Sequence, residues 1–410
     1  MKKLGILFVA FLCSCTASQN VQVAQIEDAK NPEVKLAPAT VITNYPQKNY
    51  NMGNSRPHVK GDYKFQYLKS FSVGNADTNF NLITAPPVVY NDILYVLDGH
   101  AMISAINLST NKRLWTHNLC KEDGIFKASG IAVNDNGVFV ALGNGKIFAL
   151  NKDSGETIWE TKIDKNIRSA PVLDNKSLFI QTISNDMFTY NQKTGKKESS
   201  FNGIGQDLNS PFASSPAVKG EDVVIGMSSG NLYLMKKETG VIIWGAKNYA
   251  PDASRHALQE KQITASPVFD GNNLYITSVG NMTAKYNVAS GKQIWKNETA
   301  SSITPIVSGN ILFVLDTFNN LIALNKDTGK TTWETKLNAL NRDTTVFSPF
   351  CLVNEKIITV GSDNNVYVFS ANSGKLLKRQ NIGETTLTQP VCLSDKFIIL
   401  TTDAKVVVYK

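Results

Sequence analysis

Few side chains of this 410-residue chain are spaced for chemistry. The four histidines, His58, His100, His117 and His256, are scattered without the paired spacing of a zinc site, so we expect no metal. Residues 226–230 read Gly-Met-Ser-Ser-Gly, which matches the turn that carries the nucleophile of many hydrolases. That turn must join a strand to a helix. Both flanks here have strand composition, so we interpret the segment as a hairpin turn.

Acidic groups offer no clearer site. Asp363-Asn364-Asn365 resembles a calcium loop in composition, but it lacks the required spacing and the final glutamate. Its residues are typical of a tight hairpin turn. The sequence therefore predicts a protein that is not an enzyme and that carries no cofactor.

The N-terminus predicts one covalent modification. Met1-Lys2-Lys3 and the short apolar run after it are typical of a secretory signal, which we assign to residues 1–14. Leu12-Cys13-Ser14-Cys15 is similar to a bacterial lipobox, so Cys15 is the expected lipidated residue. An ordinary cleaved signal with an incidental cysteine is the alternative. The residue after Cys15 is Thr16 rather than aspartate, as in lipoproteins forwarded to the outer membrane of Gram-negative cells.

Residues 15–62 have no strand or helix periodicity and are rich in Gln, Asn, Pro, Lys and Ala. Such composition cannot bury a core, so we predict a disordered tether. The net charge of +8 is spread along the chain without a basic run. It favours solubility, with attraction to anionic headgroups or partners as a weaker alternative and no nucleic acid.

A repeated phrase organises the remaining residues. Its form is Asn-x-x-(Ser/Thr)-Gly-x-x-x-Trp, and it recurs about every 40 to 50 residues, the period of a propeller blade. The tryptophans are Trp115, Trp159, Trp244, Trp295 and Trp333, and Ser199 and Lys378 take their place in two copies. The glycines are Gly155, Gly195, Gly240, Gly291, Gly329 and Gly374, and Asn111 takes that place in the first copy. We interpret these residues as packing devices.

Each unit carries the signals of four strands: a proline step, a β-branched run, a Gly or Asn turn and the phrase above. Eight such units predict an all-β, eight-bladed β-propeller of four-stranded antiparallel blades over residues 63–410. The eighth unit stops after its third strand at the end of the chain. Residues 65–73 have strand composition outside any unit, so we expect this N-terminal strand to close the last blade.

Three cysteines lie outside the signal region. Cys351 and Cys392 follow a proline by two residues in adjacent units, where other units have apolar residues. We therefore expect buried thiols. We predict no disulfide between them, on the argument that equivalent residues of neighbouring blades lie too far apart.

Residues 148–159 and 323–333 resemble the pyrroloquinoline-quinone-type propeller repeat, and the resemblance covers nearly all of residues 64–410. Two families share that repeat: the quinone-dependent dehydrogenases, and BamB, the lipoprotein subunit of the outer-membrane β-barrel assembly machinery. Dehydrogenases typically carry adjacent cysteines, a calcium site and long insertions, none of which is apparent. The chain is more similar to BamB. A lipid-anchored propeller with another envelope partner is a further alternative.

The resemblance to BamB implies a scaffold that docks on the barrel-forming subunit and assists unfolded outer-membrane proteins. It implies anchoring to the outer membrane by lipid, with the propeller in the periplasm. The docking loops of the family correspond to residues 203–213 and 249–264. Candidate contact residues there are Leu208, Phe212, Arg255, His256 and Leu258. Pro211 stands where the family has arginine, and Gln262 and Thr264 replace its aspartates; solvated loops without a partner are the alternative.

Overall fold

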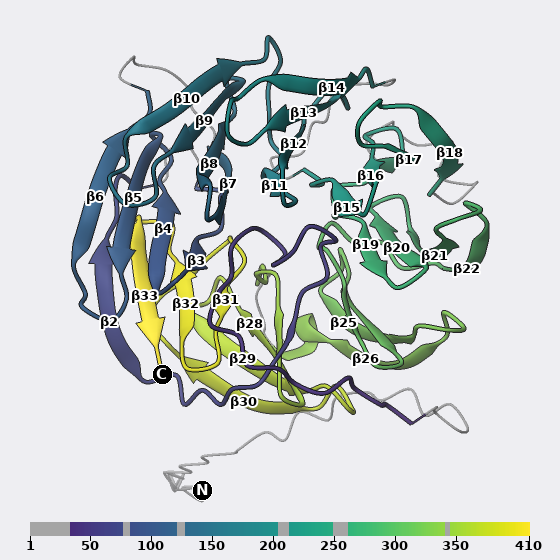
Figure 1. Ribbon diagram of the computed structural model, residues 1–410. Helices are drawn as coiled ribbons and strands as arrows, with labels where there is room; N and C mark the ends of the chain where they lie inside the picture. Colours follow the sequence, from purple (N-terminus) through teal and green to yellow (C-terminus); the bar gives the residue numbers. More distant parts are fainter. Residues whose placement is uncertain (1–32, 77–82, 121–127, 204–212, 249–260, 341–344) are drawn as a thin grey trace, which may run out of the picture.

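The chain forms a closed ring of eight small sheets around one axis (Figure 1). This computed structural model describes residues 33–76, 83–120, 128–203, 213–248, 261–340 and 345–410. Those residues form strands β1 to β33 and one short 3-10 helix, η3 (Leu337–Leu340). The predicted eight-bladed propeller is confirmed.

The first four blades use their strands in chain order, from the axis outwards, and neighbouring strands are antiparallel. Blade 1 is β3 (Val88–Tyr90), β4 (Ile93–Leu97), β5 (Met102–Asn107) and β6 (Arg113–Asn118); blade 2 is β7 (Ala128–Asn134), β8 (Gly137–Leu142), β9 (Lys146–Leu150) and β10 (Thr157–Lys162). Blade 3 is β11 (Val172–Leu173), β12 (Ser177–Gln181), β13 (Met187–Asn191) and β14 (Lys197–Phe201); blade 4 is β15 (Ala217–Lys219), β16 (Asp222–Gly226), β17 (Asn231–Lys236) and β18 (Ile242–Lys247).

The next three blades repeat this order, and the eighth departs from it. Blade 5 is β19 (Val268–Asp270), β20 (Asn273–Ser278), β21 (Met282–Asn287) and β22 (Gln293–Asn297); blade 6 is β23 (Ile306–Ser308), β24 (Ile311–Leu315), β25 (Asn320–Asn325) and β26 (Thr331–Lys336). Blade 7 is β27 (Cys351–Val353), β28 (Lys356–Val360), β29 (Asn365–Ser370) and β30 (Leu376–Asn381), with β1 (His58–Val59) added in parallel to β27. Blade 8 is β31 (Val391–Cys392), β32 (Phe397–Leu400), β33 (Lys405–Tyr409) and β2 (Tyr67–Ser72).

Burial explains which strands lie inside a blade. Every residue of β8, β12 and β24 is buried, as expected for strands covered on both faces by neighbouring blades. The outer strand β10 instead alternates between exposed and half-buried residues. Asparagines with positive φ form several connecting turns, for example Asn185 at 67°.

Blade 8 closes the ring with both ends of the described chain. Its outer strand β2 pairs antiparallel with the C-terminal strand β33, from Tyr67 opposite Tyr409 to Ser72 opposite Lys405. The prediction of closure by an N-terminal strand is confirmed. This pairing leaves no blade short of a strand, and a complete ring buries every blade face against a neighbour.

The tryptophans of the repeat phrase join each blade to the next. Trp115 in β6 donates its indole N–H to the carbonyl of Lys152 in blade 2, at 3.0 Å. The ring lies against Gly155 of the same turn, where a Cβ would come within 2.5 Å of an indole carbon. Gly155 also has a φ of 76°, which favours glycine a second time. Trp115 and Gly155 therefore pack against each other at this junction.

Junctions without tryptophan keep the same hydrogen bond. Ser199 of blade 3 donates its hydroxyl to the Lys237 carbonyl at 2.7 Å, and Lys378 of blade 7 donates its ammonium to the Lys64 carbonyl at 3.2 Å. The eighth donor is a lysine of β2, so all eight junctions carry one donor in the same strand position, which we call the slot. From donor to accepting carbonyl, the pairs are Lys69 to Leu108, Trp115 to Lys152, Trp159 to Gln192, Ser199 to Lys237, Trp244 to Val288, Trp295 to Lys326, Trp333 to Ala371 and Lys378 to Lys64.

The contact made by each remaining repeat glycine depends on the slot residue of the preceding blade. Gly195, Gly291, Gly329 and Gly374 each lie against the indole of the preceding blade, as Gly155 does. Gly240 follows the serine slot instead, and there a Cβ would lie 2.9 Å from the Ser200 carbonyl oxygen. Backbone thus occupies the space that an indole fills elsewhere.

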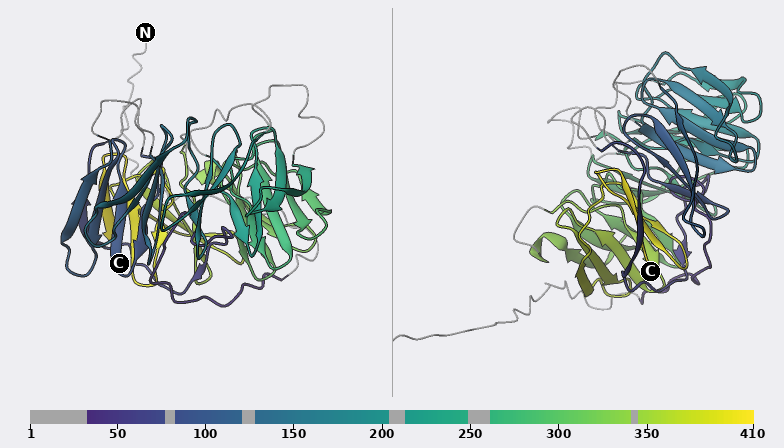
Figure 2. Two further views of the ribbon diagram at one scale, coloured as in Figure 1. Left: turned by 45° about the horizontal axis from the view of Figure 1, so that its top comes forward. Right: turned by 90° about the vertical axis from the view of Figure 1, so that its left-hand side faces the viewer.

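Residues 33–62 cross one face of the ring as an ordered segment, which we call the strap (Figure 2). The prediction of a disordered tether is wrong for these residues; residues 1–32, including Cys15 and the signal, lie outside the described part. The error has a physical cause. The strap is held mainly by backbone hydrogen bonds, which composition does not reveal.

The strap meets every blade near the axis. Its oxygens accept hydrogen bonds from the inner strands or from the turns after them, where a sheet edge would otherwise leave N–H groups unpaired. From blade 1 to blade 8, these donors and acceptors are Val89 to Tyr45, Val133 to Pro46, Leu173 to the Gln47 side chain, Val218 to Met52, Phe269 to Gly53, Asn310 to Lys35, Asn354 to Val59 and Ser394 to Ile42.

Cys351 and Cys392 form a disulfide, so the prediction of two free thiols is wrong. Both residues are buried, as expected, and they lie on the inner strands of blades 7 and 8. Inner strands converge towards the axis, which brings the two Cα atoms to 6.5 Å, within bridging range. Cys120 is free and buried.

Shortening one slot residue measures the strength of a blade junction. We expect Trp295→Ala to lower the free energy of unfolding by about 3 to 5 kcal/mol, because the change leaves a cavity and an unpaired carbonyl. Trp295→Phe should cost less, about 1 to 2 kcal/mol, because the ring stays and the hydrogen bond is lost. Urea denaturation gives both values. Ile294→Thr, at the exposed neighbouring position, is the control; equal losses for all three variants would contradict the slot interpretation.

Removing the disulfide should destabilise the ring. Its two cysteines are 41 residues apart, and a closed loop of that length contributes about 3 to 4 kcal/mol through the unfolded state. We expect Cys351→Ala with Cys392→Ala to lose that amount in urea denaturation, whereas Cys120→Ala should lose less. A thiol assay on denatured wild-type protein should gain two thiols per chain on reduction. No gain would show that the bridge does not form.

Candidate functional site

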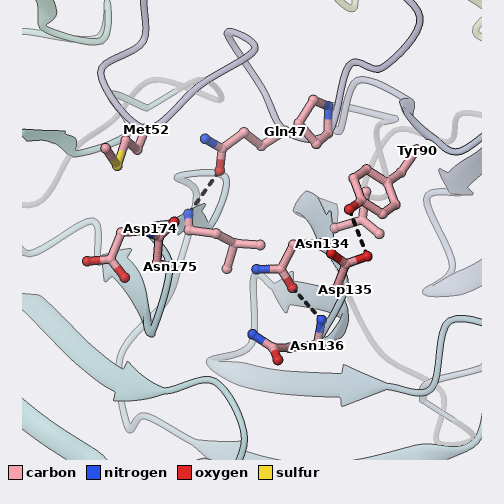
Figure 3. Close-up of a pocket in the computed structure, with 11 residues that line it drawn as sticks. Gln47, Met52, Tyr90, Asn134, Asp135, Asn136, Asp174 and Asn175 are labelled. Carbon is pink, nitrogen blue, oxygen red and sulfur yellow. Dashed lines mark hydrogen bonds between the residues drawn. The ribbon is translucent and has the colours of Figure 1, made fainter.

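A hollow between the strap and blades 2 and 3 opens on the strap side of the ring (Figure 3). Its volume is about 310 Å³, and amide and carboxylate groups line it. Gln47 reaches down from the strap and accepts the Leu173 N–H at 2.9 Å. Across the hollow, the Tyr90 hydroxyl donates to Asp135 at 2.9 Å. Burial raises the pKa of Tyr90, and the hydrogen bond to Asp135 raises it as well. The turns between inner and second strands position these groups.

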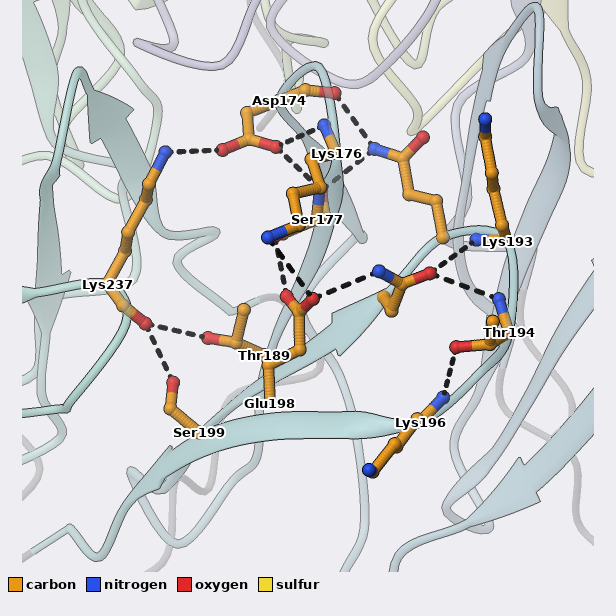
Figure 4. Close-up of polar contacts among 12 residues, drawn as sticks. Asp174, Lys176, Ser177, Thr189, Lys193, Thr194, Lys196, Glu198, Ser199 and Lys237 are labelled. Atoms are coloured by element: carbon orange, nitrogen blue, oxygen red, sulfur yellow. Dashed lines mark hydrogen bonds and ion pairs between the residues drawn. The ribbon is translucent and has the colours of Figure 1, made fainter.

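Asp174 connects this hollow to a second one at the junction of blades 3 and 4 (Figure 4). One oxygen of its carboxylate accepts the Lys176 and Ser177 backbone N–H groups, at 2.8 and 2.6 Å. The other accepts the ammonium of Lys237 at 2.9 Å. Burial alone would lower the pKa of Lys237, but the bond to Asp174 and its charge raise it. Lys237 therefore stays charged at neutral pH.

The second hollow lies beside the serine slot and has a volume of about 440 Å³. Ser177 donates its hydroxyl to Glu198 at 2.8 Å, and Lys176 lies 3.9 Å from the same carboxylate. Lys196, Lys197 and Lys237 also line the hollow, together with Thr189 and Glu238. Since both carboxylates, those of Asp174 and Glu198, are held by hydrogen-bond donors, this surface is suited to polar binding rather than to proton transfer.

An apolar strip flanks the lysines. Val241, just before the outer strand of blade 4, and Ile242 and Ile243, the first residues of that strand, are exposed by 62%, 41% and 43%. Three consecutive exposed apolar residues form a small apolar patch on the surface. Sequence reasoning missed this strip, although the uninterrupted Val-Ile-Ile run after Gly240 was its signal. Together, the two hollows and the strip form one surface, which we call the blade 2–4 surface.

The contact residues predicted from the sequence cannot be compared with this surface. Leu208, Phe212, Arg255, His256 and Leu258 all lie outside the described residues. The residues that flank their two connections are fixed: the Gly203 N–H donates to Asp186 at 3.0 Å, and the Asn248 side chain donates to the Met282 carbonyl at 3.1 Å. Gln262 and Thr264 are buried. These anchors lie between blades 3 and 4 and between blades 4 and 5.

The other sequence motifs have structural roles where the structure describes them. Gly226 ends β16 and Asn231 begins β17, so the Gly-x-Ser-x-Gly segment is a turn between two strands, as predicted. In the described ranges, no three His, Cys, Asp or Glu side chains are grouped as metal ligands would be. The described residues also contain no helix with the length and apolar character to cross a membrane.

Known proteins share both the sequence and the fold. Outer membrane protein assembly factor BamB of Salmonella typhimurium is 26% identical over 358 residues, 85% of this chain and 90% of that protein. The crystal structure of BamB from Moraxella catarrhalis superposes with a TM-score of 0.70 at 17% identity, over 84% of this chain and 99% of that one. Quinohemoprotein alcohol dehydrogenase from Comamonas testosteroni has a TM-score of 0.69 at 11% identity, over 90% and 81% of the two chains, which shows likeness of fold alone.

A family profile decides between the BamB family and the quinone-dependent dehydrogenases. The profile described as outer membrane protein assembly factor BamB matches residues 99–310 and 284–410, two overlapping segments that together span most of the ring. The chain therefore belongs to the BamB family.

Proposed function

We propose that this protein is a non-enzymatic scaffold of the machinery that assembles β-barrel proteins in the outer membrane of a Gram-negative bacterium. The family match over most of the ring carries this proposal. Lipid on Cys15 anchors the chain to the outer membrane, and the propeller works in the periplasm. Its partners are the barrel-forming subunit and unfolded outer-membrane protein clients.

Docking on the barrel-forming subunit uses the two connections that flank blade 4. Their candidate contact residues are Leu208, Phe212, Arg255, His256 and Leu258. Loops on a rigid scaffold commonly carry binding residues, and apolar and arginine side chains contribute most to interface energies. The anchors of both connections are hydrogen-bonded to neighbouring turns, so the blades fix where each connection leaves the ring.

The blade 2–4 surface offers clients a different kind of contact. Amides and paired lysines can bind the polar backbone of an unfolded chain, and the strip from Val241 to Ile243 can bury apolar side chains. Contacts of this kind do not depend on a particular client sequence. A scaffold that meets many clients needs such tolerance.

Charged residues in the first connection should abolish docking. We expect Leu208→Glu with Phe212→Glu to remove co-purification of the barrel-forming subunit from solubilised membranes, because both changes place charges where apolar contact is required. Leu68→Glu with Leu114→Glu, at exposed apolar positions of blades 8 and 1, is the matched control and should keep full recovery. Undiminished recovery with the first pair would remove this docking site. Loss of recovery with Ile243→Glu instead would move the contact to the blade 4 strip.

The dehydrogenase alternative has a direct assay. The purified protein, supplied with pyrroloquinoline quinone and calcium, should not reduce an artificial electron acceptor when alcohols are added. The reason is the missing cofactor equipment, since the two bridged cysteines are 41 residues apart rather than adjacent. Alcohol-dependent reduction above the rate of the quinone alone would refute the scaffold assignment.

A further inference from the structure

The strap carries two cations towards the axis of the ring. Arg56 is 3% exposed and donates to the carbonyl of Phe350 at 2.7 Å and to that of Thr304. Its guanidinium also lies over the Phe350 ring, 5.0 Å from the centroid. The Nε atom of Arg56 is buried and has no hydrogen-bond partner among the described residues. One donor of this buried charge is therefore unused.

Lys48 is the second cation. Its ammonium donates to the carbonyl of Ala213 at 3.2 Å. Burial, and next the nearby charge of Arg56, together lower the pKa of Lys48 to about 8. Burial also lowers the pKa of Arg56, to about 10. The two groups thus repel each other, and within the described residues neither forms an ion pair with a carboxylate.

The wall beside these cations is polar. Ser215 donates its N–H to the Ser266 hydroxyl, and Ser266 donates its N–H to the Thr304 hydroxyl, both at 3.0 Å. These residues precede the inner strands of blades 4, 5 and 6. The Thr304 carbonyl also accepts a hydrogen bond from Arg56. These bonds therefore connect the residue that Arg56 contacts with Ser215, two residues after the Ala213 that Lys48 contacts.

Further groups there lack partners. The hydroxyl of Ser215 and the side-chain oxygen of Asn49 are buried without a hydrogen bond to any residue that the structure describes. Among the described residues, the one ionisable neighbour that opposes the charge of Arg56 is the phenol of Tyr45. Burial raises the pKa of Tyr45, so this phenol is neutral at physiological pH. No group described here therefore compensates the two positive charges.

Two like charges that have lost their hydration are unfavourable unless an opposite charge joins them. We propose that one small inorganic anion, of the class of chloride or phosphate, binds beside Arg56 and Lys48 near the axis of the ring. The free Nε of Arg56, the ammonium of Lys48 and the hydroxyl of Ser215 are its donors. The anion must be small because the strap itself crosses the ring at this point. This inference concerns the stability of the ring and does not depend on the proposed scaffold role.

Thermal unfolding at constant ionic strength tests the proposal. The full chain is moved into sodium gluconate, whose anion is bulky, and chloride or phosphate then replaces the gluconate. We expect the Tm of the wild-type protein to rise by at least about 2 °C with one or both small anions, because binding to the folded state stabilises it. A rise with phosphate alone would identify the larger anion, and a rise with chloride alone the smaller.

Variants at Lys48 separate this site from general salt effects. Lys48→Met should remove the response to both anions. In gluconate it should also unfold at a higher temperature than the wild-type protein, because it removes an uncompensated charge. Lys219→Met is the matched control, since that lysine also donates to a carbonyl but lies on the surface, and it should keep the response. Equal responses of wild-type protein and Lys48→Met would overturn the proposal.

Bromide supplies a second measurement that needs no variant. Crystals of the wild-type protein grown in bromide should show an anomalous scattering peak within contact distance of Arg56 Nε and Lys48 Nζ. Density without anomalous signal at that place would indicate water. Water there, together with no Tm response to chloride or phosphate, would show that no anion binds beside Arg56 and Lys48.

Discussion

The hydrogen bond from each slot residue to a carbonyl of the next blade is the interaction on which this ring depends. Propeller blades share no backbone hydrogen bonds across their faces, so side chains must fix how one blade sits on the next. Five indoles, one hydroxyl and two ammonium groups do this at equivalent positions. Every slot residue supplies a donor, but the slot side chains differ in size. Where serine replaces tryptophan, the backbone of Ser200 lies against Gly240 and fills the space that an indole fills elsewhere.

The strap joins the blades near the axis, as the slot residues join them near the rim. Inner strands are short and would leave unpaired N–H groups near the axis, and the strap supplies an acceptor to each blade. The disulfide between blades 7 and 8 adds a covalent link at the same radius. Crossing the axis also carries Arg56 and Lys48 into a confined polar space. The same segment thus stabilises the ring through its backbone and brings a charge imbalance through its side chains.

The periodic part of the structure was predictable because packing repeats. The eight-bladed ring follows from the spacing of the repeat, and Tyr67–Ser72 closes blade 8. The strap was not predictable, because it binds through backbone atoms and has the composition of a disordered chain. The bridge between Cys351 and Cys392 was missed because distance along the chain says little about strands that converge on an axis. The blade 2–4 surface joins turns of different units, so no single segment of sequence marks it.

The strap can dock fully only on a complete ring. Residues 33–62 leave the ribosome before any blade, yet their acceptors are matched to donors on all eight, the last of them near Ser394. Synthesis runs from the N-terminus, so this segment cannot settle until the final blade has been made and joined to Tyr67–Ser72. It is therefore translated before every blade and is the last segment to dock. A protease that cuts it would distinguish finished molecules from those still maturing.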